Sequence, residues 1–242
     1  MRPLRRALPL LAIPLLIAAW GCADKDGAAQ TTDDGVVPSD VRLVEQRADH
    51  ARVKGDSAAP LRMVEVSDFQ CPYCKRFYED TYAKIDSAYV QTGKIRYVWI
   101  SFPNPGHVRA WPAVEAAFCA GAVGKFWPMH DLLFEHQDDW KDAAEPVALF
   151  EKYAAQLDID ADSYRECLVQ DRPAALQVQD LAGVTRVGVS GTPFFVIGDS
   201  TSVQGAAPFE KFRTVIDSLL AHRAAAGSGG TAADTGAAAP GS

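Results

Sequence analysis

The chain has 242 residues, and 48% of them are hydrophobic, so it is long enough to bury the core of one large domain or two small ones. Its formal net charge is −7 at pH 7 and it has no basic stripe, which argues against nucleic acid as a partner. The composition therefore predicts a protein with a real hydrophobic core and no nucleic-acid partner.

The N-terminus has the features of a secretory signal in residues 1–21. Three arginines precede an apolar run from Ala7 to Trp20, which is too short and too interrupted by proline for a comfortable membrane span. Gly21-Cys22 follows at once and resembles the lipobox of bacterial lipoproteins, in which the cysteine is lipidated. The alternative is an ordinary signal peptide cut near Ala28-Ala29, with Cys22 discarded. We expect export to the periplasm or the outer face of a bacterial membrane, with a lipid anchor as the sole membrane contact.

The rest of the chain divides into a tether, a folded region and a tail. Residues 22–40 are small and polar, and as a flexible tether they would reach roughly 20–25 Å. Residues 224–242 are Ala, Gly, Ser and Thr with almost no large apolar side chain, so we expect disorder there. The folded region is then 41–223, without an apparent internal repeat.

Strand and helix patterns alternate at the start of the folded region. Leu61–Phe69 is typical of a buried strand that carries one charge, Glu65. Tyr73–Tyr89 has large apolar residues at near-helical spacing, and Lys94–Phe102 is a second strand that ends at prolines. This order predicts a βαβ unit.

A helical region covers about residues 108–187, and strand character returns after it. Two short strands are expected at Pro193–Ile197 and Thr201–Gln204, followed by an amphipathic helix at Pro208–His222. The whole order predicts one α/β domain with an embedded all-helical subdomain. The helices expected in that subdomain are Arg109–Ala122, Pro128–Gln137, Pro146–Leu157, Ala161–Gln170 and Pro173–Val187.

Two cysteines with two residues between them lie where the first strand meets the first helix. The segment Cys71-Pro72-Tyr73-Cys74 lets both sulfurs occupy the first turn of a helix, where N–H groups are unpaired and carry partial positive charge. A thiolate is stabilised there, and the thiolate is the nucleophile in thiol chemistry. A C-x-x-C pair is also half of a zinc site. The leading interpretation is a dithiol–disulfide exchange centre.

The remaining cysteines allow a second pair. An exported chain meets an oxidising compartment, where thiols tend to pair. If Cys22 is lipidated or removed, four cysteines remain and three pairings are open. Cys71 and Cys74 form the local pair, which leaves Cys119 with Cys167, and we favour a structural disulfide between them. The alternative is that both are simply buried without a bond.

Four features of the folded region resemble the DsbA-like branch of the thioredoxin superfamily, in which a helical domain interrupts a thioredoxin fold. They are the segment Asp68–Cys74, the stretch from Cys119-Ala120 through residues 124–134, the block Gly188–Phe195, and the order in which these occur. Together they are far more specific than C-x-x-C alone. The resemblance implies a thioredoxin-like fold, with βαβ and ββα units, interrupted by the all-helical subdomain.

The resemblance also implies roles for the cysteine motif. Cys71 would be the exposed nucleophile that forms a mixed disulfide with a substrate, and Cys74 the less exposed resolving thiol. Pro72 and Tyr73, which lie between the two cysteines, would contribute to substrate binding. The resemblance implies no cofactor beyond the cysteine pair. The strongest oxidases of the family have Pro-His at these positions. The neutral Tyr73 should stabilise the thiolate less, which predicts a less oxidising pair.

Two more elements take roles from the resemblance. About 5% of X-Pro bonds in folded proteins are cis, but the family likeness implies a cis bond at Thr192-Pro193, which turns the backbone of Thr192 toward Cys71, where a substrate strand can pair. Glu65 lies six residues before Cys71 and would be buried beneath the site, with a raised pKa that lets it handle the proton of Cys74. The alternative is that Glu65 faces solvent. Asp68 is assigned to the turn.

Other candidate residues are interpreted as structural. The spacing of the histidines matches no zinc pattern, so we expect no metal site among His107, His130 and His136. Aromatic residues of the helical region are expected to form its core, namely Trp111, Phe118, Phe126, Trp127 and Phe134.

The sequence thus predicts an exported thiol:disulfide oxidoreductase that acts as an oxidase. Its expected partners are exported proteins with thiols or disulfides, and a membrane or soluble redox protein that recycles the dithiol. One alternative is an isomerase or reductase, although residues 41–59 look too short and polar for the dimerisation arm that isomerases need. The other is a non-catalytic module that uses the same dithiol to bind a metal.

Overall fold

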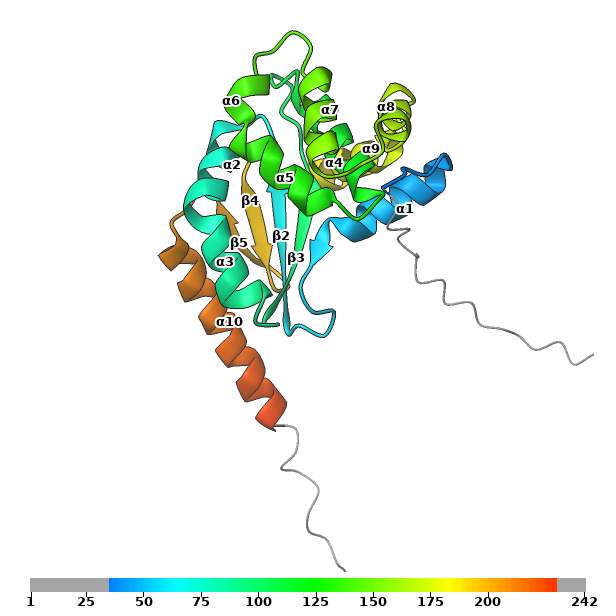
Figure 1. The fold of residues 1–242 in the computed structure, drawn as a ribbon. Helices are drawn as coiled ribbons and strands as arrows, with labels where there is room; N and C mark the ends of the chain where they lie inside the picture. The colour runs from blue at the N-terminus through cyan, green and yellow to red at the C-terminus, as the bar shows by residue number, and fades with distance from the viewer. Residues whose placement is uncertain (1–34, 230–242) are drawn as a thin grey trace, which may run out of the picture. The chain divides into compact units, whose positions relative to one another are not determined.

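The computed structural model describes residues 35–229, which are drawn in colour in Figure 1. The expected signal at 1–21, the Cys22 site, most of the tether and the end of the tail lie outside the described residues. Within residues 35–229, no helix combines the length and the apolar character needed to cross a membrane.

A mixed sheet forms the centre of the described part, where five strands follow the order β1-β3-β2-β4-β5. Strands β2 (Leu61–Ser67) and β3 (Ile95–Ser101) are parallel neighbours in its middle. Strand β4 (Phe194–Ile197) pairs antiparallel with β2, and β5 (Thr201–Gln204) pairs antiparallel with β4. The predicted α/β fold, with its βαβ and ββα units, is confirmed.

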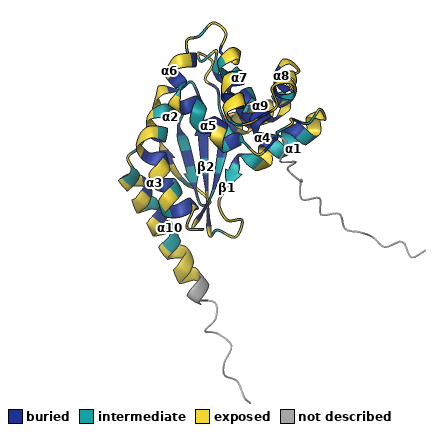
Figure 2. Cartoon of the chain, in the orientation of Figure 1, coloured by how far each residue is buried: buried dark blue, intermediate teal, exposed yellow. Residues whose placement is uncertain are grey.

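Alternating residues of β3 point into the hydrophobic core. In β3, Ile95, Tyr97 and Trp99 are fully buried, whereas the residues between them are only partly covered. This period of two is what a strand produces when one of its faces packs against helices. Figure 2 shows the result, with buried strands inside and the exposed sides of the helices outside.

A long helix connects β2 to β3 and contains two π-helical turns. It runs through α2 (Pro72–Phe77), η1 (Tyr78–Tyr82), α3 (Ala83–Ile85) and η2 (Asp86–Val90) without a break. The sequence predicted its extent within one residue at each end, but not its π-helical turns. Each such turn inserts a residue into the α-helical repeat and so re-aims the side chains that follow it.

The last helix, α10 (Phe209–Gly229), lies beside α2–η2 on one face of the sheet (Figure 1). Three aromatic rings pack together here, one each from α2, β4 and α10. The ring of Phe77 has its centroid 4.5 Å from that of Phe195 in β4 and 5.5 Å from that of Phe212 in α10. Helix α10 also corrects the expected tail, because residues 224–229 continue it. This stretch is rich in alanine, the residue with the highest helix propensity.

The chain between β3 and β4 is helical, so the predicted insertion is confirmed. Two details differ from expectation: the second helix begins at Phe126 rather than Pro128, and a bend at His136 separates it from a short extra helix. The helices are α4 (Ala110–Gly121), α5 (Phe126–Glu135), α6 (Gln137–Trp140), α7 (Val147–Gln156), α8 (Ala161–Val169) and α9 (Ala174–Arg186).

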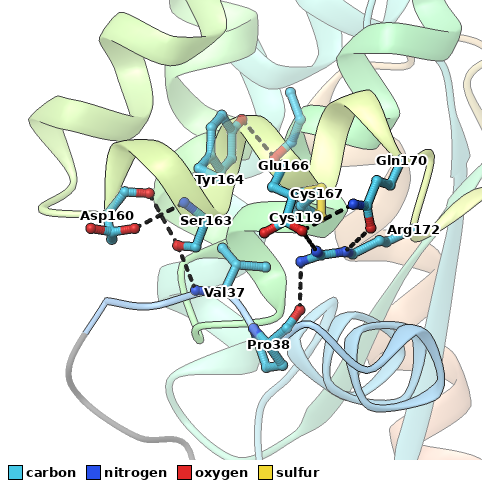
Figure 3. Close-up of a disulfide and its surroundings, with 11 residues drawn as sticks. Val37, Pro38, Cys119, Asp160, Ser163, Tyr164, Glu166, Cys167, Gln170 and Arg172 are labelled. Atoms are coloured by element: carbon cyan, nitrogen blue, oxygen red, sulfur yellow. Dashed lines mark hydrogen bonds and ion pairs between the residues drawn. A yellow bond between two sulfur atoms is a disulfide. The ribbon is translucent and has the colours of Figure 1, made fainter.

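The folded region begins before residue 41, which corrects the expected tether for residues 35–40. Val37 is buried, and its N–H donates to Ser163 Oγ at 3.0 Å (Figure 3). The buried guanidinium of Arg172 donates to the carbonyl of Pro38 at 2.8 Å. We call residues 35–40 the N-terminal strap. The buried side chain of Val37, the Val37 N–H and the Pro38 carbonyl hold this strap against the helical insertion. The segment is short, so the sequence gives no sign of these contacts.

The strap leads into two elements that the sequence did not predict. Helix α1 (Val41–Ala51) starts at Asp40, whose carboxylate accepts a hydrogen bond from the Leu43 N–H and so caps the helix. Strand β1 (Val53–Lys54) then pairs antiparallel with β3 at the edge of the sheet.

Cys119 in α4 and Cys167 in α8 are joined by a disulfide (Figure 3). Its S–S distance is 1.98 Å and both residues are fully buried. Beside it, the hydroxyl of Tyr164 donates to the carbonyl of Ala116 at 3.0 Å, which links the same two helices a second time. The disulfide therefore joins α4 to α8, the helix whose Ser163 binds the N-terminal strap.

Candidate active site

Cys71 lies at the junction where β2 ends and α2 begins. It is the N-cap residue of α2, and Pro72 occupies the first helical turn, where its missing N–H costs nothing. The cap has no side-chain hydrogen bond. The N–H groups of Tyr73 and Cys74 therefore remain available, and both interact with the Cys71 sulfur.

These contacts make Cys71 unusually acidic. The hydrogen bond from the Cys74 thiol lowers the pKa of Cys71 most, and the Thr192 side chain and the two backbone N–H groups lower it further, against the effect of burial. The resulting pKa is about 6 instead of the ordinary 9.0, so the thiolate predominates at pH 7.

The two cysteines are tuned in opposite directions. Both are free thiols in this structure. Cys74 is fully buried, and burial raises its pKa well above 9.0, with further increases from the hydrogen bond and the charge of Cys71. One sulfur is thus held as a thiolate and its neighbour as a thiol.

Cys71 is more accessible than Cys74, as expected, but far less exposed than the sequence suggested. Only 5% of the residue is exposed. The reason is the loop before β4, where the Thr192–Pro193 peptide bond is cis and the Thr192 carbonyl lies 3.6 Å from the Cys71 sulfur. The carbonyl of Pro193 accepts a hydrogen bond from the Gly205 N–H at 2.8 Å, which ties the loop to the end of β5.

Tyr73 lies on the open side of the motif. Tyr73 is 56% exposed, and the Arg76 guanidinium lies 5.1 Å from the centre of its ring. The phenol ring therefore faces solvent and its own helix.

Side chains from the helical insertion hold the turn before Cys71. The buried amide of Gln137 in α6 donates to the carbonyls of Phe69, at 2.5 Å, and Cys71, at 3.2 Å. Gln70 donates to the Lys141 carbonyl at 2.9 Å and accepts from the Arg109 N–H at 2.7 Å. Sequence reasoning missed both glutamines, because their partners are distant in sequence and no local motif marks them.

Asp68 completes this turn and is fully buried. Its carboxylate accepts hydrogen bonds from the Gln70 N–H at 2.8 Å and the Asn104 N–H at 2.9 Å, and lies 2.6 Å from His107 Nδ1. The assignment of Asp68 to the turn therefore agrees with its contacts, and it also fastens the loop after β3 to the motif.

Glu65 lies in β2, two strand positions below the end of the strand, and is 1% exposed. The solvent-facing alternative is therefore wrong. Burial raises the pKa of Glu65 above its ordinary 4.5, and this effect is opposed by the charge of His130 and by the hydroxyl of Tyr97, which donates to the carboxylate.

The pKa of Glu65 leads to a prediction with a definite sign. An unfolded chain releases the Glu65 proton near pH 4.5, whereas the folded chain keeps it to a higher pH, so folding stability falls as pH rises through this window. The variant Glu65→Gln should be more stable than the parent at pH 8 and lose that advantage at pH 4. Urea unfolding at both pH values measures the difference.

The same variant tests the role of Glu65 in exchange. We expect Glu65→Gln to slow disulfide exchange by about 10²-fold, as befits the loss of a general acid–base group. An unchanged rate and an unchanged pH profile would contradict that role.

The histidines have protein partners. His107 faces Asp68, and His136 Nδ1 lies 3.1 Å from Asp139. His130 is buried among aromatic rings and lies 2.8 Å from Asp131. Within the described residues, no three His, Cys, Asp or Glu side chains are grouped so as to hold a metal ion. Of the aromatic residues expected in the core, Phe118, Phe126 and Phe134 are fully buried, whereas Trp111 and Trp127 are partly covered.

Comparison with known proteins places this geometry in a family. A family model described as thioredoxin matches residues 47–218. The structure is similar to that of alpha-DsbA1 from Wolbachia pipientis, with a TM-score of 0.66 and 22% identity over 72% of this chain and 93% of the other. At this identity the likeness concerns the fold.

Two curated relatives differ in how much of each protein is shared. The chain is 38% identical over 174 residues to Na(+)/H(+) antiporter NhaA 3 of Salinispora tropica, which covers 71% of this chain but only 24% of that protein. It is 25% identical over 171 residues to disulfide bond formation protein D of Bacillus subtilis, which covers 69% of this chain and 76% of the relative. The chain thus spans about a quarter of the antiporter's length.

Proposed function

Because this chain belongs to the thioredoxin family, and to its DsbA-like type with a helical insertion, we propose that it is an exported thiol:disulfide oxidoreductase that acts through Cys71 and Cys74. The opposite tuning of the two thiols is the observation that carries the proposal. An exchange centre needs one sulfur that is a good nucleophile and leaving group at neutral pH, and a second that is held in reserve.

The proposed reaction has two exchange steps. In the oxidising direction, a substrate thiolate attacks the Cys71 sulfur of the Cys71–Cys74 disulfide, and Cys74 leaves as a thiolate that is then protonated. A second substrate thiolate attacks the substrate sulfur of the mixed disulfide. A disulfide forms in the substrate, and Cys71 leaves as a thiolate whose low pKa makes it a good leaving group.

The loop that contains Thr192 and Pro193 is the proposed binding element for substrate. Thr192 lies beside the reacting sulfur, and Tyr73, two residues after Cys71, is 56% exposed. An extended substrate segment that pairs with the backbone at Thr192 would bring its own cysteine to Cys71.

Oxidation is the proposed net direction. The contacts that stabilise the Cys71 thiolate stabilise the reduced protein, and this makes its disulfide a stronger oxidant. The Cys119–Cys167 disulfide is typical of a protein that works in an oxidising compartment, and it supports export to the periplasm or outer membrane face. A membrane or soluble redox protein would then reoxidise the dithiol.

The reduction potential of the Cys71–Cys74 pair tests the proposal. We expect a value well above about −200 mV in a glutathione buffer, together with catalysed formation of disulfides in a reduced, unfolded substrate protein. A potential close to that of thioredoxin, about −270 mV, would overturn the oxidising direction. A wild-type protein that exchanges no disulfides would overturn the proposed function itself.

Lipidation of Cys22 is the proposed mode of attachment to the membrane. Mass spectrometry of the mature protein decides between this proposal and an ordinary signal peptide. A lipidated N-terminal Cys22 is expected, and an unmodified N-terminus downstream of it would rule out the anchor.

The identity of residue 73 should set the potential. We expect Tyr73→His to raise the reduction potential by about 30 mV or more, because a cationic side chain beside the motif favours the thiolate and each tenfold change in equilibrium constant corresponds to about 30 mV. Equilibration with glutathione, read by alkylation of free thiols, measures the change. Tyr73→Phe is the matched control and should leave the potential unchanged; an equal shift in both variants would show that ring packing, not charge, is responsible.

A further inference from the structure

The two faces of the central sheet differ in how well they are covered. One face carries fully buried side chains, such as those of Tyr97 and Trp99. On the opposite face, Val64 of β2 pairs with Val98 of β3 and with Val196 of β4, and all three are only partly covered. This second face is therefore an apolar surface that the helices leave partly open.

A groove of about 300 Å³ lies where this second face meets α9. Its volume is at the lower end of the range for small-molecule sites. Val187, at the end of α9, is 75% exposed, so the groove opens to solvent. We call it the valine groove, because most of its lining is apolar, namely Val64, Val66, Ile100, Val184, Val187 and Val196.

Two arginines lie at one end of the valine groove. Arg62 lines it, and Arg96 pairs with Arg62 across β2 and β3, so both side chains leave the same face of the sheet. Neither guanidinium group has a hydrogen bond or an ion pair within the part of the chain that the structure describes, whereas Arg52, Arg172 and Arg223 each face a carboxylate. Like charges at directly paired positions of neighbouring strands destabilise a sheet. An anion bound beside both arginines would remove this repulsion.

The opposite end of the groove carries no free charge. Asp180 of α9 lines it there, but its carboxylate is paired with Arg52 and accepts a hydrogen bond from the Ser101 N–H at 3.0 Å. Ser101 is the last residue of β3, whereas Arg96 is the second. The valine groove is thus cationic at one end, apolar in its middle and closed by a neutralised pair at the other end.

The backbone around the groove favours an alkyl chain over a polypeptide as its occupant. Strand β2 is hydrogen-bonded to β3 on one side and to β4 on the other, so its backbone offers no free group to a ligand on this face. A peptide laid on the face would leave its own N–H and C=O groups without partners, which is costly away from water. An alkyl chain has no such groups, and its burial against valines is favourable.

We propose that the valine groove binds a free single-chain carboxylate of the fatty-acid type. Its carboxylate would lie beside Arg62 and Arg96, since guanidinium groups bind carboxylates through strong, charge-assisted hydrogen bonds. Its alkyl chain would extend over Val64 and Val66 toward α9. From Arg62 to Val66 the strand rises about 13 Å, which suits a chain of medium length. This site is separate from the Cys71–Cys74 centre and does not rest on the proposed function.

Titration calorimetry of the full chain with sodium decanoate, kept below its micelle concentration, tests the proposal. We expect saturable binding at one site and a melting temperature that rises with decanoate concentration. The double variant Arg62→Gln with Arg96→Gln should bind about tenfold more weakly or less. Arg42→Gln is the matched control and should bind as the parent does, because Arg42 is an exposed arginine that lines a separate pocket between α1 and α9. Absence of decanoate binding, or equal binding by parent and double variant, would overturn the proposal.

Two further probes separate the contributions of the head and of the chain. Acetate carries the carboxylate without the chain, and 1-decanol carries the chain without the charge, so each should bind about tenfold more weakly than decanoate or less. Acetate binding as tight as that of decanoate would reduce the site to a simple anion site, and equally tight decanol binding would show that the arginines take no part. Sedimentation with phosphatidylglycerol vesicles, but no binding of decanoate, would assign the face to a membrane surface. Each of these three results contradicts the proposal.

The stability of the ligand-free double variant completes the test. Since Arg62 and Arg96 face each other without partners, their replacement should leave the urea midpoint of unfolding unchanged or raise it. Weaker decanoate binding then reflects the loss of the two charges in a folded protein. A markedly lower midpoint would show that the arginines stabilise the fold, and would contradict the unpartnered pair on which the site depends. A chain that binds decanoate but exchanges no disulfides would refute the proposed function and leave the valine groove standing.

Discussion

Replacing Cys74 with serine is expected to trap mixed disulfides between Cys71 and substrate proteins, and to lower turnover by at least roughly 10³-fold. In the described residues, Cys74 is the only free thiol besides Cys71, so no other described sulfur resolves the intermediate. The serine hydroxyl still offers a hydrogen bond to Cys71, so the nucleophile stays active. Non-reducing electrophoresis followed by mass spectrometry identifies the trapped partners.

The control for this experiment is Cys71→Ser, which should form no complexes at all. Cys74 then remains as a buried thiol with a raised pKa, and such a thiol reacts poorly with bulky proteins. If folded Cys74→Ser protein formed no reducible complexes, or if Cys71→Ser formed as many, the assignment of nucleophile and resolving thiol would be wrong.

Removing the structural disulfide should have the largest effect on stability. For Cys119→Ala with Cys167→Ala, we expect the free energy of unfolding to fall by about 4 kcal/mol, because the bond closes a loop with a sequence separation of 48. The melting temperature should drop by about 10 °C. Urea unfolding and calorimetry of the double variant measure both quantities.

The matched comparison is Cys71→Ala with Cys74→Ala, which removes the other cysteine pair and keeps the structural bond. Near-native stability of the Cys119/Cys167 variant would show that packing between α4 and α8 is sufficient without the bond. Proteolysis near residues 35–40 provides a second readout, since Ser163 and Arg172 hold the N-terminal strap from the same part of the insertion.

The parts of the fold that sequence could predict are those with a local signature. The apolar run that ends at Pro103 marks the second strand, and Pro72 marks the first turn of a helix. The DsbA-like resemblance added the helical insertion and the cis bond before Pro193, neither of which follows from periodicity.

Long-range contacts explain most of what the sequence did not predict. Gln137 is an ordinary polar residue in its own segment, and only the fold brings its amide to the carbonyls of Phe69 and Cys71. Helix α1 buries only Val44 and Ala48, so the face that it turns to the core is narrow and is easily missed in the sequence.

The loop around Thr192 has a consequence for the chain while it is being made. Thr192 follows Cys71 by 121 positions, and β4 can join β2 only after the whole helical insertion has been synthesised. Until then Cys71 lacks this neighbour, which is one of the groups that lower its pKa below the ordinary 9.0. The Thr192 contact, which helps to lower the pKa of Cys71, is therefore added to the local contacts of the motif only when β4 is in place. The environment of Cys71 is therefore complete only when the fold is complete.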